Sequence, residues 1–391
     1  MPTSIGTQDF IRNAVTTAHH FGFAPVDRLR EHAACKSCTD RVDHRASAMD
    51  RRTDALHGML TQGMCSYFEN KLNAIDGPVL FYSVEQVPRT GEPAITVQIF
   101  NVRKSIGEAL LIQTIRSLLK DIGYGENVVR INSLGDQDSV TRYIRELTNF
   151  LKKRVEDMPL SARELMKEHP MVALMHLIEK EHELARKGPN PLEFLTDLSR
   201  KHFREIVEFL DQSGTPFEID PRLLGHHDCY SDALFAFDFM NDMGERLTES
   251  PLYIRGGRYN TFVQKMSRTK VPAVGAVVVL KDKKVPTSLS VPRVRPEPSI
   301  FVVQLGFGPK VRSLLLIDEL KRSGIHVQQN VTSDSLSEQL RLAEAKNAVY
   351  AVIIGQKEYV EDKVILRNLR ARTQTILPIG DLSSYLRKVA A

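Results

Sequence analysis

Hydrophobic positions in the last quarter of the chain alternate between helix-like and strand-like spacing. Apolar residues that recur every three or four positions predict three helices, at Val311–Ser323, Ser335–Lys346 and Asp381–Lys388. Short apolar runs predict strands between them, at Ile300–Leu305, His326–Gln328, Val349–Ile354 and Val364–Leu369. Strands that alternate with helices predict a small α/β domain with a mostly parallel sheet and helices on its faces.

The pattern before residue 283 is different, because strands and helices are grouped. The runs Pro78–Val87 and Ala94–Val102 flank a short loop with Pro and Gly, which predicts an antiparallel hairpin. Helices are predicted at Ile5–Phe23 and Ile106–Ile122, and the pattern from Asp138 to Leu210 is almost wholly helical. Further strands are predicted at Val128–Asn132, Pro216–Ile219, Leu234–Phe239, Leu252–Arg255 and Val274–Leu280. We therefore expect an α+β fold in which a helical insertion interrupts an antiparallel sheet.

A proline-rich stretch without apolar periodicity separates the two kinds of pattern and predicts an extended linker. We place the first part of the antiparallel core at 1–130 and the helical insertion at 131–215. The second part of the core follows at 216–282, the linker at 283–298 and the C-terminal α/β domain at 299–391.

Composition is that of a globular chain, with 42% hydrophobic and 26% charged residues. The longest apolar runs fall far short of the roughly 18–20 residues that a membrane span needs, so we expect no membrane association. The first residues lack the basic and apolar regions of a secretory signal, and four cysteines are too few for a disulfide framework, which favours the cytoplasm. The net charge is +5. From Pro298 onward thirteen Lys/Arg stand against nine Asp/Glu, which permits an anionic partner such as RNA.

Several strings, taken in chain order, resemble the histidyl-tRNA synthetase family. They are the opening IGTQDFIRN, then INSLGD at Ile131–Asp136, RGGRYN at Arg255–Asn260 with the strand after it, and SLSEQLRLAEAKNAVYAVIIGQKE at Ser335–Glu358. The resemblance covers nearly the whole chain and is weakest between Asp27 and Asp76. It implies a class II synthetase core, whose antiparallel sheet holds ATP and the amino acid. It also implies a helical insertion, an anticodon-binding domain and a homodimer.

Amino-acid activation needs cations beside the α-phosphate of ATP, helped by Mg²⁺, and the family supplies arginines from three places. When Gln98 is aligned with the family's glutamine, Val84 and Ala94 occupy the arginine positions of the hairpin. The segment Arg222–Phe237 places Gly225 at the second position, and Asp282 stands at the third. We therefore expect a divergent or paralogous member with lost or weakened adenylation, in which ATP and Mg²⁺ are cofactors only if activity remains. No catalytic residue is assigned, and the candidates for phosphate contact are Arg89, Lys281 and Lys283.

A pocket for histidine is implied by the same resemblance. Its candidate residues are Asp54 for the α-amine, together with Gln98, Asp228, Tyr230, Arg258 and Tyr259. Structural roles compete with this interpretation: Gln98 would satisfy buried polar groups, Tyr230 would be a half-buried aromatic residue, and the paired glycines before Arg258 would make a tight turn.

Two further groups of residues have competing interpretations. Cys35 and Cys38 have the spacing of half a zinc site, with His32 and His44 nearby, but a structural zinc needs four ligands, so we predict no metal. Basic residues near the end of a predicted strand are candidate contacts for RNA phosphates, against the alternative of a solvated charged face: Lys363, Arg367, Arg370 and Arg372.

Three functions are compatible with these features. The first is a tRNA-associated protein that binds tRNA or histidine with little or no charging. The second is a regulatory partner of the ATP phosphoribosyltransferase catalytic subunit, a histidine-sensing role known in the family. The missing arginines suit it, but the C-terminal domain counts against it. The third is an active ligase that joins histidine to tRNA-His with ATP.

Overall fold

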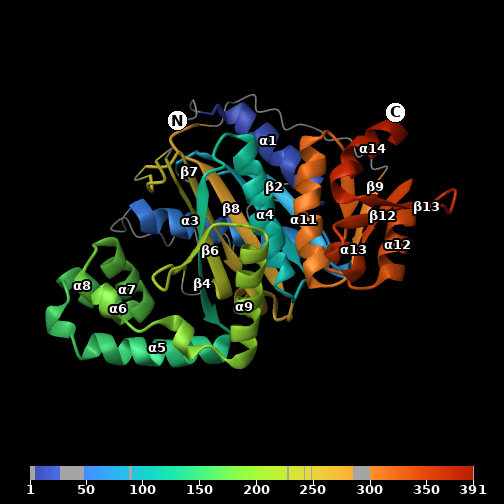
Figure 1. Ribbon diagram of the computed structural model, residues 1–391. Helices are drawn as coiled ribbons and strands as arrows, with labels where there is room; N and C mark the ends of the chain where they lie inside the picture. Colours follow the sequence, from blue (N-terminus) through green and yellow to red (C-terminus); the bar gives the residue numbers. More distant parts are fainter. Residues whose placement is uncertain are drawn as a thin grey trace.

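The computed structural model of the protein describes residues 5–26, 48–87, 90–226, 229–241, 243–247, 249–284 and 300–390. Of residues 48–56 and 389–390 only the backbone is described. Two sheets organise the chain, an eight-stranded one before the linker and a five-stranded one after it (Figure 1). Within the described residues, no helix has the length and apolar character that crossing a membrane requires.

The larger sheet has the strand order β1-β2-β3-β8-β7-β6-β4-β5. Its strands are β1 (Ala24–Pro25), β2 (Val79–Gln86), β3 (Pro93–Phe100), β4 (Asn127–Gly135), β5 (Phe217–Ile219), β6 (Ser231–Phe239), β7 (Leu252–Arg258) and β8 (Ala273–Leu280). All neighbours are antiparallel except the two outermost pairs, β1 with β2 and β4 with β5. The predicted antiparallel core and its β2–β3 hairpin are confirmed.

Different helices cover the two faces of this sheet. Helices α1 (Thr7–His20) and α4 (Ile106–Asp121) pack on one face, where Ile95, Val97 and Ile99 of β3 point. Helix α3 (Ala48–Glu69) packs on the other face, together with α10 (Asn260–Ser267) and the short η1 (Leu72–Ala74). Because side chains alternate along a strand, Ala94, Thr96, Gln98 and Phe100 of β3 all point to the α3 side, which we call the α3 face.

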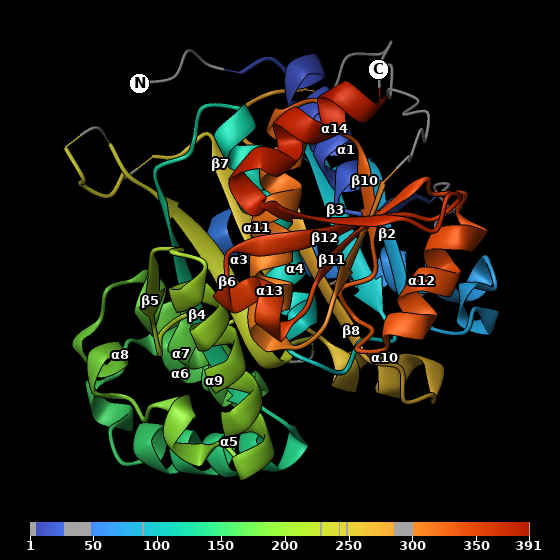
Figure 2. The ribbon, with the colours of Figure 1, turned by 45° about the vertical axis from the view of Figure 1, so that its right-hand side comes forward.

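The helical insertion starts later than expected, because β4 continues to Gly135 and the first helix begins at Gln137. It contains α5 (Gln137–Lys152), η2 (Val155–Asp157), α6 (Leu160–Glu168), α7 (Pro170–Glu179), α8 (Glu183–Lys187) and η3 (Pro191–Phe194). These elements project to one side of the molecule, away from the C-terminal domain, in both views (Figures 1 and 2). Helix α9 (Asp197–Gln212) then returns to pack on α4.

Asp136, the last residue of the INSLGD string, fastens the base of this insertion. Its carboxylate caps α5 by accepting from the Ser139 backbone at 2.9 Å, and it also accepts from the Thr196 hydroxyl at 2.7 Å. Its own backbone N–H donates to the Ser199 hydroxyl at 3.0 Å. Side-chain caps of this kind stabilise helix starts, so the string joins the first turns of α5 and α9.

The C-terminal domain is a five-stranded mixed sheet in the order β10-β9-β11-β12-β13. Its strands are β9 (Ile300–Gln304), β10 (Val327–Gln329), β11 (Tyr350–Ile354), β12 (Lys363–Asn368) and β13 (Gln374–Pro378). Its helices are α11 (Phe307–Arg322), α12 (Leu336–Ala345), α13 (Gln356–Val360), η4 (Ile379–Asp381) and α14 (Leu382–Ala390). Only β10, β9 and β11 are parallel, so the expected mostly parallel sheet is corrected: β12 and the unpredicted β13 are antiparallel additions.

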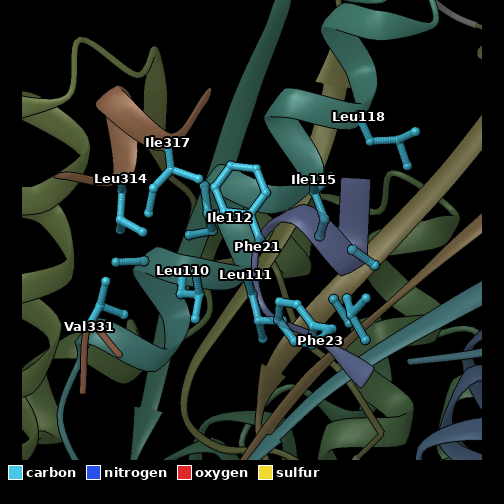
Figure 3. Packing of buried hydrophobic residues seen from close by; sticks show 14 of the residues in the cluster. Phe21, Phe23, Leu110, Leu111, Ile112, Ile115, Leu118, Leu314, Ile317 and Val331 are labelled. Carbon is cyan, nitrogen blue, oxygen red and sulfur yellow. The ribbon is translucent and has the colours of Figure 1, made fainter. Parts of the chain in front are cut away.

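The two sheets share one hydrophobic core at the junction of the domains. Leu314 and Ile317 of α11 pack beside Ile112 of α4 and Phe21, which follows α1 (Figure 3). All four side chains are fully buried. The C-terminal domain is therefore docked on the helices that cover the opposite side of the sheet from α3.

Candidate functional site

Two glycines and a glutamine form the floor of the α3 face. Gln98 of β3 lies opposite Gly275 of β8, which in turn lies opposite Gly257 of β7. A Cβ atom at Gly275 would approach the side chains of Gln98 and Leu60 to 3.0 Å. The glycines thus let neighbouring side chains lie flat on the sheet, where the resemblance places the amino-acid ligand.

Gln98 and Tyr259 are held together at this floor. The Tyr259 hydroxyl donates to Oε1 of Gln98 at 2.6 Å, and both side chains are fully buried. Burial raises the pKa of Tyr259 well above its usual range, so the phenol keeps its proton and remains a donor. The bond fixes the amide orientation, and Nε2 of Gln98 has no hydrogen-bond partner among the described residues.

Tyr230 explains why residue 225 is glycine. A Cβ atom at Gly225 would lie 2.3 Å from the Tyr230 ring, and one at Gly257 would lie 2.8 Å from it. Any side chain at position 225 would therefore displace this ring. Next to it, His226 stacks on His57 of α3 with ring centroids 4.1 Å apart, a contact that the sequence did not suggest.

Arg258 does not lie with the other predicted pocket residues. It is fully buried on the α4 side of the sheet and forms two hydrogen bonds with the Glu108 carboxylate, at 2.7 and 2.6 Å. A third bond goes to the Val102 carbonyl at 2.8 Å. Arg258 is therefore a core residue, because its side chain points to the opposite face of β7 from the face of Gly257.

Arg255 reaches the α3 face instead, and sequence reasoning missed it. It stands two residues before Gly257 on β7, so both share one face. Its guanidinium donates to the Leu224 carbonyl at 2.5 Å and lies 5.9 Å from the centroid of the Tyr253 ring. The alternation of β7 was the available signal, but only the register with Gln98 shows which face matters.

The end of the hairpin where the resemblance puts the α-phosphate has an acidic character. Val84 points to the α4 side, whereas Glu85 lies on the α3 face and is buried. The Ser83 hydroxyl donates to the Glu85 carboxylate, and the Thr96 hydroxyl donates to it at 3.2 Å. The described residues of the hairpin therefore supply no cation that could hold a triphosphate at this end.

The candidate phosphate contacts are placed only in part. Lys281 and Lys283 are half-buried in the turn after β8. This turn is fixed to the hairpin because the Asp282 backbone N–H donates to Glu92 at 3.0 Å. Arg89, like the pocket candidate Asp228, lies outside the described residues, and of Asp54 only the backbone in α3 is described.

No metal site emerges from the part of the chain that the structure describes, since no three His, Cys, Asp or Glu side chains gather there as a metal ion requires. The possible half-site Cys35 and Cys38, with His32 and His44, lies outside the described residues.

Three of the four candidate RNA contacts gather at the turn between β12 and β13. Arg367 ends the paired part of β12 opposite Gln374, and Arg370 and Arg372 are exposed in the turn itself. Lys363 begins β12, about 14 Å away at 3.4 Å per residue, and its ammonium pairs with Glu361 at 2.9 Å. The turn therefore presents a compact group of three arginines.

The chain is similar to known proteins in sequence and in fold. Residues 311–389 match the family described as "Anticodon binding domain". The chain is 27% identical over 301 residues to the histidine–tRNA ligase of Geobacillus kaustophilus, covering 76% of this chain and 67% of that protein. It is 25% identical over 335 residues to the histidine–tRNA ligase of Caldanaerobacter subterraneus subsp. tengcongensis, covering 82% and 79% respectively. The chain is a divergent relative of the histidyl-tRNA synthetases.

The crystal structure of apo S. aureus histidyl-tRNA synthetase shares the fold, with a TM-score of 0.52 over 96% of this chain and 94% of that one at 17% identity. The segment that matches the anticodon-binding family, residues 311–389, lies in the C-terminal domain between α11 and α14 and includes the three-arginine turn.

Proposed function

We propose that this chain is a histidyl-tRNA-synthetase-like protein that binds tRNA and histidine, with adenylation lost or strongly weakened. The observation that carries the proposal is the identity of the residues that stand where the family has arginines. Val84, Ala94, Gly225 and Asp282 occupy these positions, and none of them is a cation. Gly225 cannot gain a side chain without moving Tyr230.

The size of the expected defect follows from the chemistry. Attack of a carboxylate on the α-phosphate builds negative charge on the phosphate oxygens, and preorganised cations stabilise that charge. Loss of one such group typically costs about 3–4 kcal/mol, or about 10²–10³ in rate, and several losses combine non-additively.

ATP–pyrophosphate exchange with histidine tests this directly. We expect exchange at least about a hundredfold slower than that of a histidine–tRNA ligase such as the G. kaustophilus relative measured in parallel. Exchange at a comparable rate would overturn the proposal. It would favour the alternative that the chain is an active histidine–tRNA ligase, the activity in the names of its relatives, with ATP and Mg²⁺ as cofactors.

Binding of tRNA is supported by the anticodon-binding match and the three-arginine turn. Filter binding of tRNA should weaken when Arg367, Arg370 and Arg372 are all replaced by alanine, and the slope of affinity against salt should become shallower. Replacement of the exposed Arg341, Lys357 and Lys388 of the same domain, which also removes three positive charges, provides a charge-matched control. Equal losses in both variants would contradict a specific role for the turn.

Recovery of partners from cell extract distinguishes the proposal from the remaining alternative, a regulatory role. Enrichment of tRNA supports the proposal, whereas enrichment of an ATP phosphoribosyltransferase catalytic subunit supports a regulatory role in histidine synthesis. The anticodon-binding match favours tRNA. Homodimer formation is also part of the proposal, and light scattering on the purified chain tests it.

A further inference from the structure

Arg255 is a buried cation to which the described residues offer no acidic partner. Its side chain is 8% exposed, and its Nη1 donates to the Leu224 carbonyl. Among the residues that the structure describes, no carboxylate forms an ion pair with it. The other buried arginine of β7, Arg258, has the carboxylate of Glu108 at 2.6 Å. Burial of an unpaired charge is unfavourable, so such groups usually have a counter-ion when the site is in use.

The position of Arg255 places this charge beside the proposed amino-acid pocket. Arg255 lies opposite Val277, which lies opposite Thr96, so it is one side-chain row away from the row of Gln98, Gly275 and Gly257. Rows on one face are about 7 Å apart. The ring of Tyr253 lies on one side of the arginine, and Gly257, which has no side chain, lies on the other.

The chemistry of the guanidinium indicates which anion fits. Because Nη1 is engaged by Leu224, the edge formed by Nε and Nη2 remains without a protein acceptor among the described residues. This edge presents two parallel N–H donors, which match the two oxygens of a carboxylate. We propose that Arg255 holds the α-carboxylate of the amino-acid ligand of this pocket, an inference that rests on the proposed histidine binding.

An ion pair between Arg255 and the ligand carboxylate favours binding of an amino acid over its activation. A carboxylate held by a buried two-point ion pair has its charge stabilised in the ground state, which makes it a weaker nucleophile toward phosphorus. The same contact makes the pocket selective for a free carboxylate over the corresponding alcohol. Arg255 thereby acts as a specificity residue.

Calorimetry on the full chain tests the inference with two ligands, L-histidine and L-histidinol, which lacks the carboxylate. The wild type should bind histidine at least about tenfold more tightly than histidinol, and Arg255→Met should lose about tenfold in histidine affinity while histidinol affinity changes little. Arg255→Lys, a point charge without the fork, should lie between them. Arg246→Met is the matched control, because Arg246 pairs with Glu218 at the surface.

Each other outcome has a defined meaning. No preference for histidine in the wild type, or equal losses of both ligands in a folded Arg255→Met variant, overturns the inference. A loss of ATP binding without a loss of histidine binding assigns the arginine to a phosphate and overturns it as well. If the wild type binds neither ligand, the part of the proposed function that concerns histidine binding is wrong. Thermal shifts with the other free amino acids then decide: a shift that disappears in Arg255→Met retains the carboxylate role, and no shift with any of them overturns it.

Discussion

Arg258 and Glu108 form a two-point ion pair inside the core, with a separation of 150 residues in sequence. Both side chains are 1% exposed. Nε2 of His202 also lies 2.9 Å from Oε1 of Glu108. Burial by itself would raise the pKa of Glu108, but the charges of Arg258 and His202 outweigh it and lower the pKa to about 2. The pair joins β7, α4 and α9.

Replacement of Arg258 by methionine should therefore affect stability and not ligand binding. The variant leaves the Glu108 carboxylate buried without its main partner, which is expected to cost about 3–5 kcal/mol. Urea denaturation measures the free energy of unfolding. Histidine affinity per folded molecule should remain within about twofold of the wild type, since Arg258 lies on the face away from Gln98.

The double variant Arg258→Met with Glu108→Leu provides the control, because it removes both charges. It should recover much of the lost stability, since a buried pair replaced by apolar groups is often neutral. A wild-type free energy of unfolding in the single variant, or a selective loss of histidine binding, would contradict the structural role of Arg258.

Gly63 of α3 controls how Gln98 is held. A Cβ atom at this position would lie 1.7 Å from Nε2 of Gln98 and 2.4 Å from its Cδ. Gly63→Ala should displace the amide, break the bond to Tyr259 and destabilise the fold by about 1–3 kcal/mol. Thermal denaturation measures this, and Gly125→Ala is the control because its Cβ would meet Lys120 at an ordinary 3.7 Å. Equal melting temperatures of the two variants would disprove the steric argument.

Local patterns were sufficient to predict the elements near the candidate site. The helix predicted at Ile106–Ile122 is α4, and the hairpin strands lie within two residues of their predicted bounds. The helix prediction rests on apolar periodicity, and the hairpin prediction rests on two apolar runs that flank a loop with Pro and Gly. The edge strand β13 was missed because most of its residues are exposed and no apolar run marks it.

The roles of the two arginines in the RGGRYN string were not predictable in the same way. Arg255 and Arg258 are three residues apart and so must point to opposite faces of a strand. The sequence does not say which face carries the ligand pocket, because that depends on pairing with Gln98 through Gly275. It also does not reveal that Glu108 on a distant helix is the partner of Arg258.

Lys321 of α11 should be central to docking of the C-terminal domain. Its ammonium donates to the hydroxyls of Thr17 at 2.7 Å and Ser117 at 3.0 Å, and it pairs with Asp121. Lys321→Met keeps the apolar stem but leaves these acceptors without their donor, which should cost about 1–3 kcal/mol. Thermal denaturation measures the loss, and amide hydrogen exchange should increase along α1 and α11.

The exposed Lys357 provides the control for this prediction. Lys357→Met should change stability by no more than about 0.5 kcal/mol, as is usual for surface positions. If both lysine variants behave alike, the contacts of Lys321 contribute nothing to docking, and the hydrophobic core at the junction accounts for it alone.

His20 should make the same junction sensitive to acid. It is 3% exposed, and Nε2 bonds to the Ile317 carbonyl at 3.0 Å. Burial lowers the pKa of His20 to about 4; the bond to Ile317 and the charge of Asp318 oppose this shift, while the charges of Lys321 and His326 add to it. The folded protein thus keeps His20 neutral at pH values where the unfolded chain, with a pKa near 6.5, binds a proton.

The sign of the effect follows from this difference. Stability is unaffected by His20 above pH 6.5 and falls as the pH is lowered toward 4, by up to about 3 kcal/mol. Urea denaturation at pH 7, 5.5 and 4.5 measures the slope. His20→Gln retains a donor for Ile317 but cannot titrate, so its curve should be flatter than that of the wild type over this window. Every other titrating group is common to both proteins, so parallel curves would show that His20 is not the group responsible.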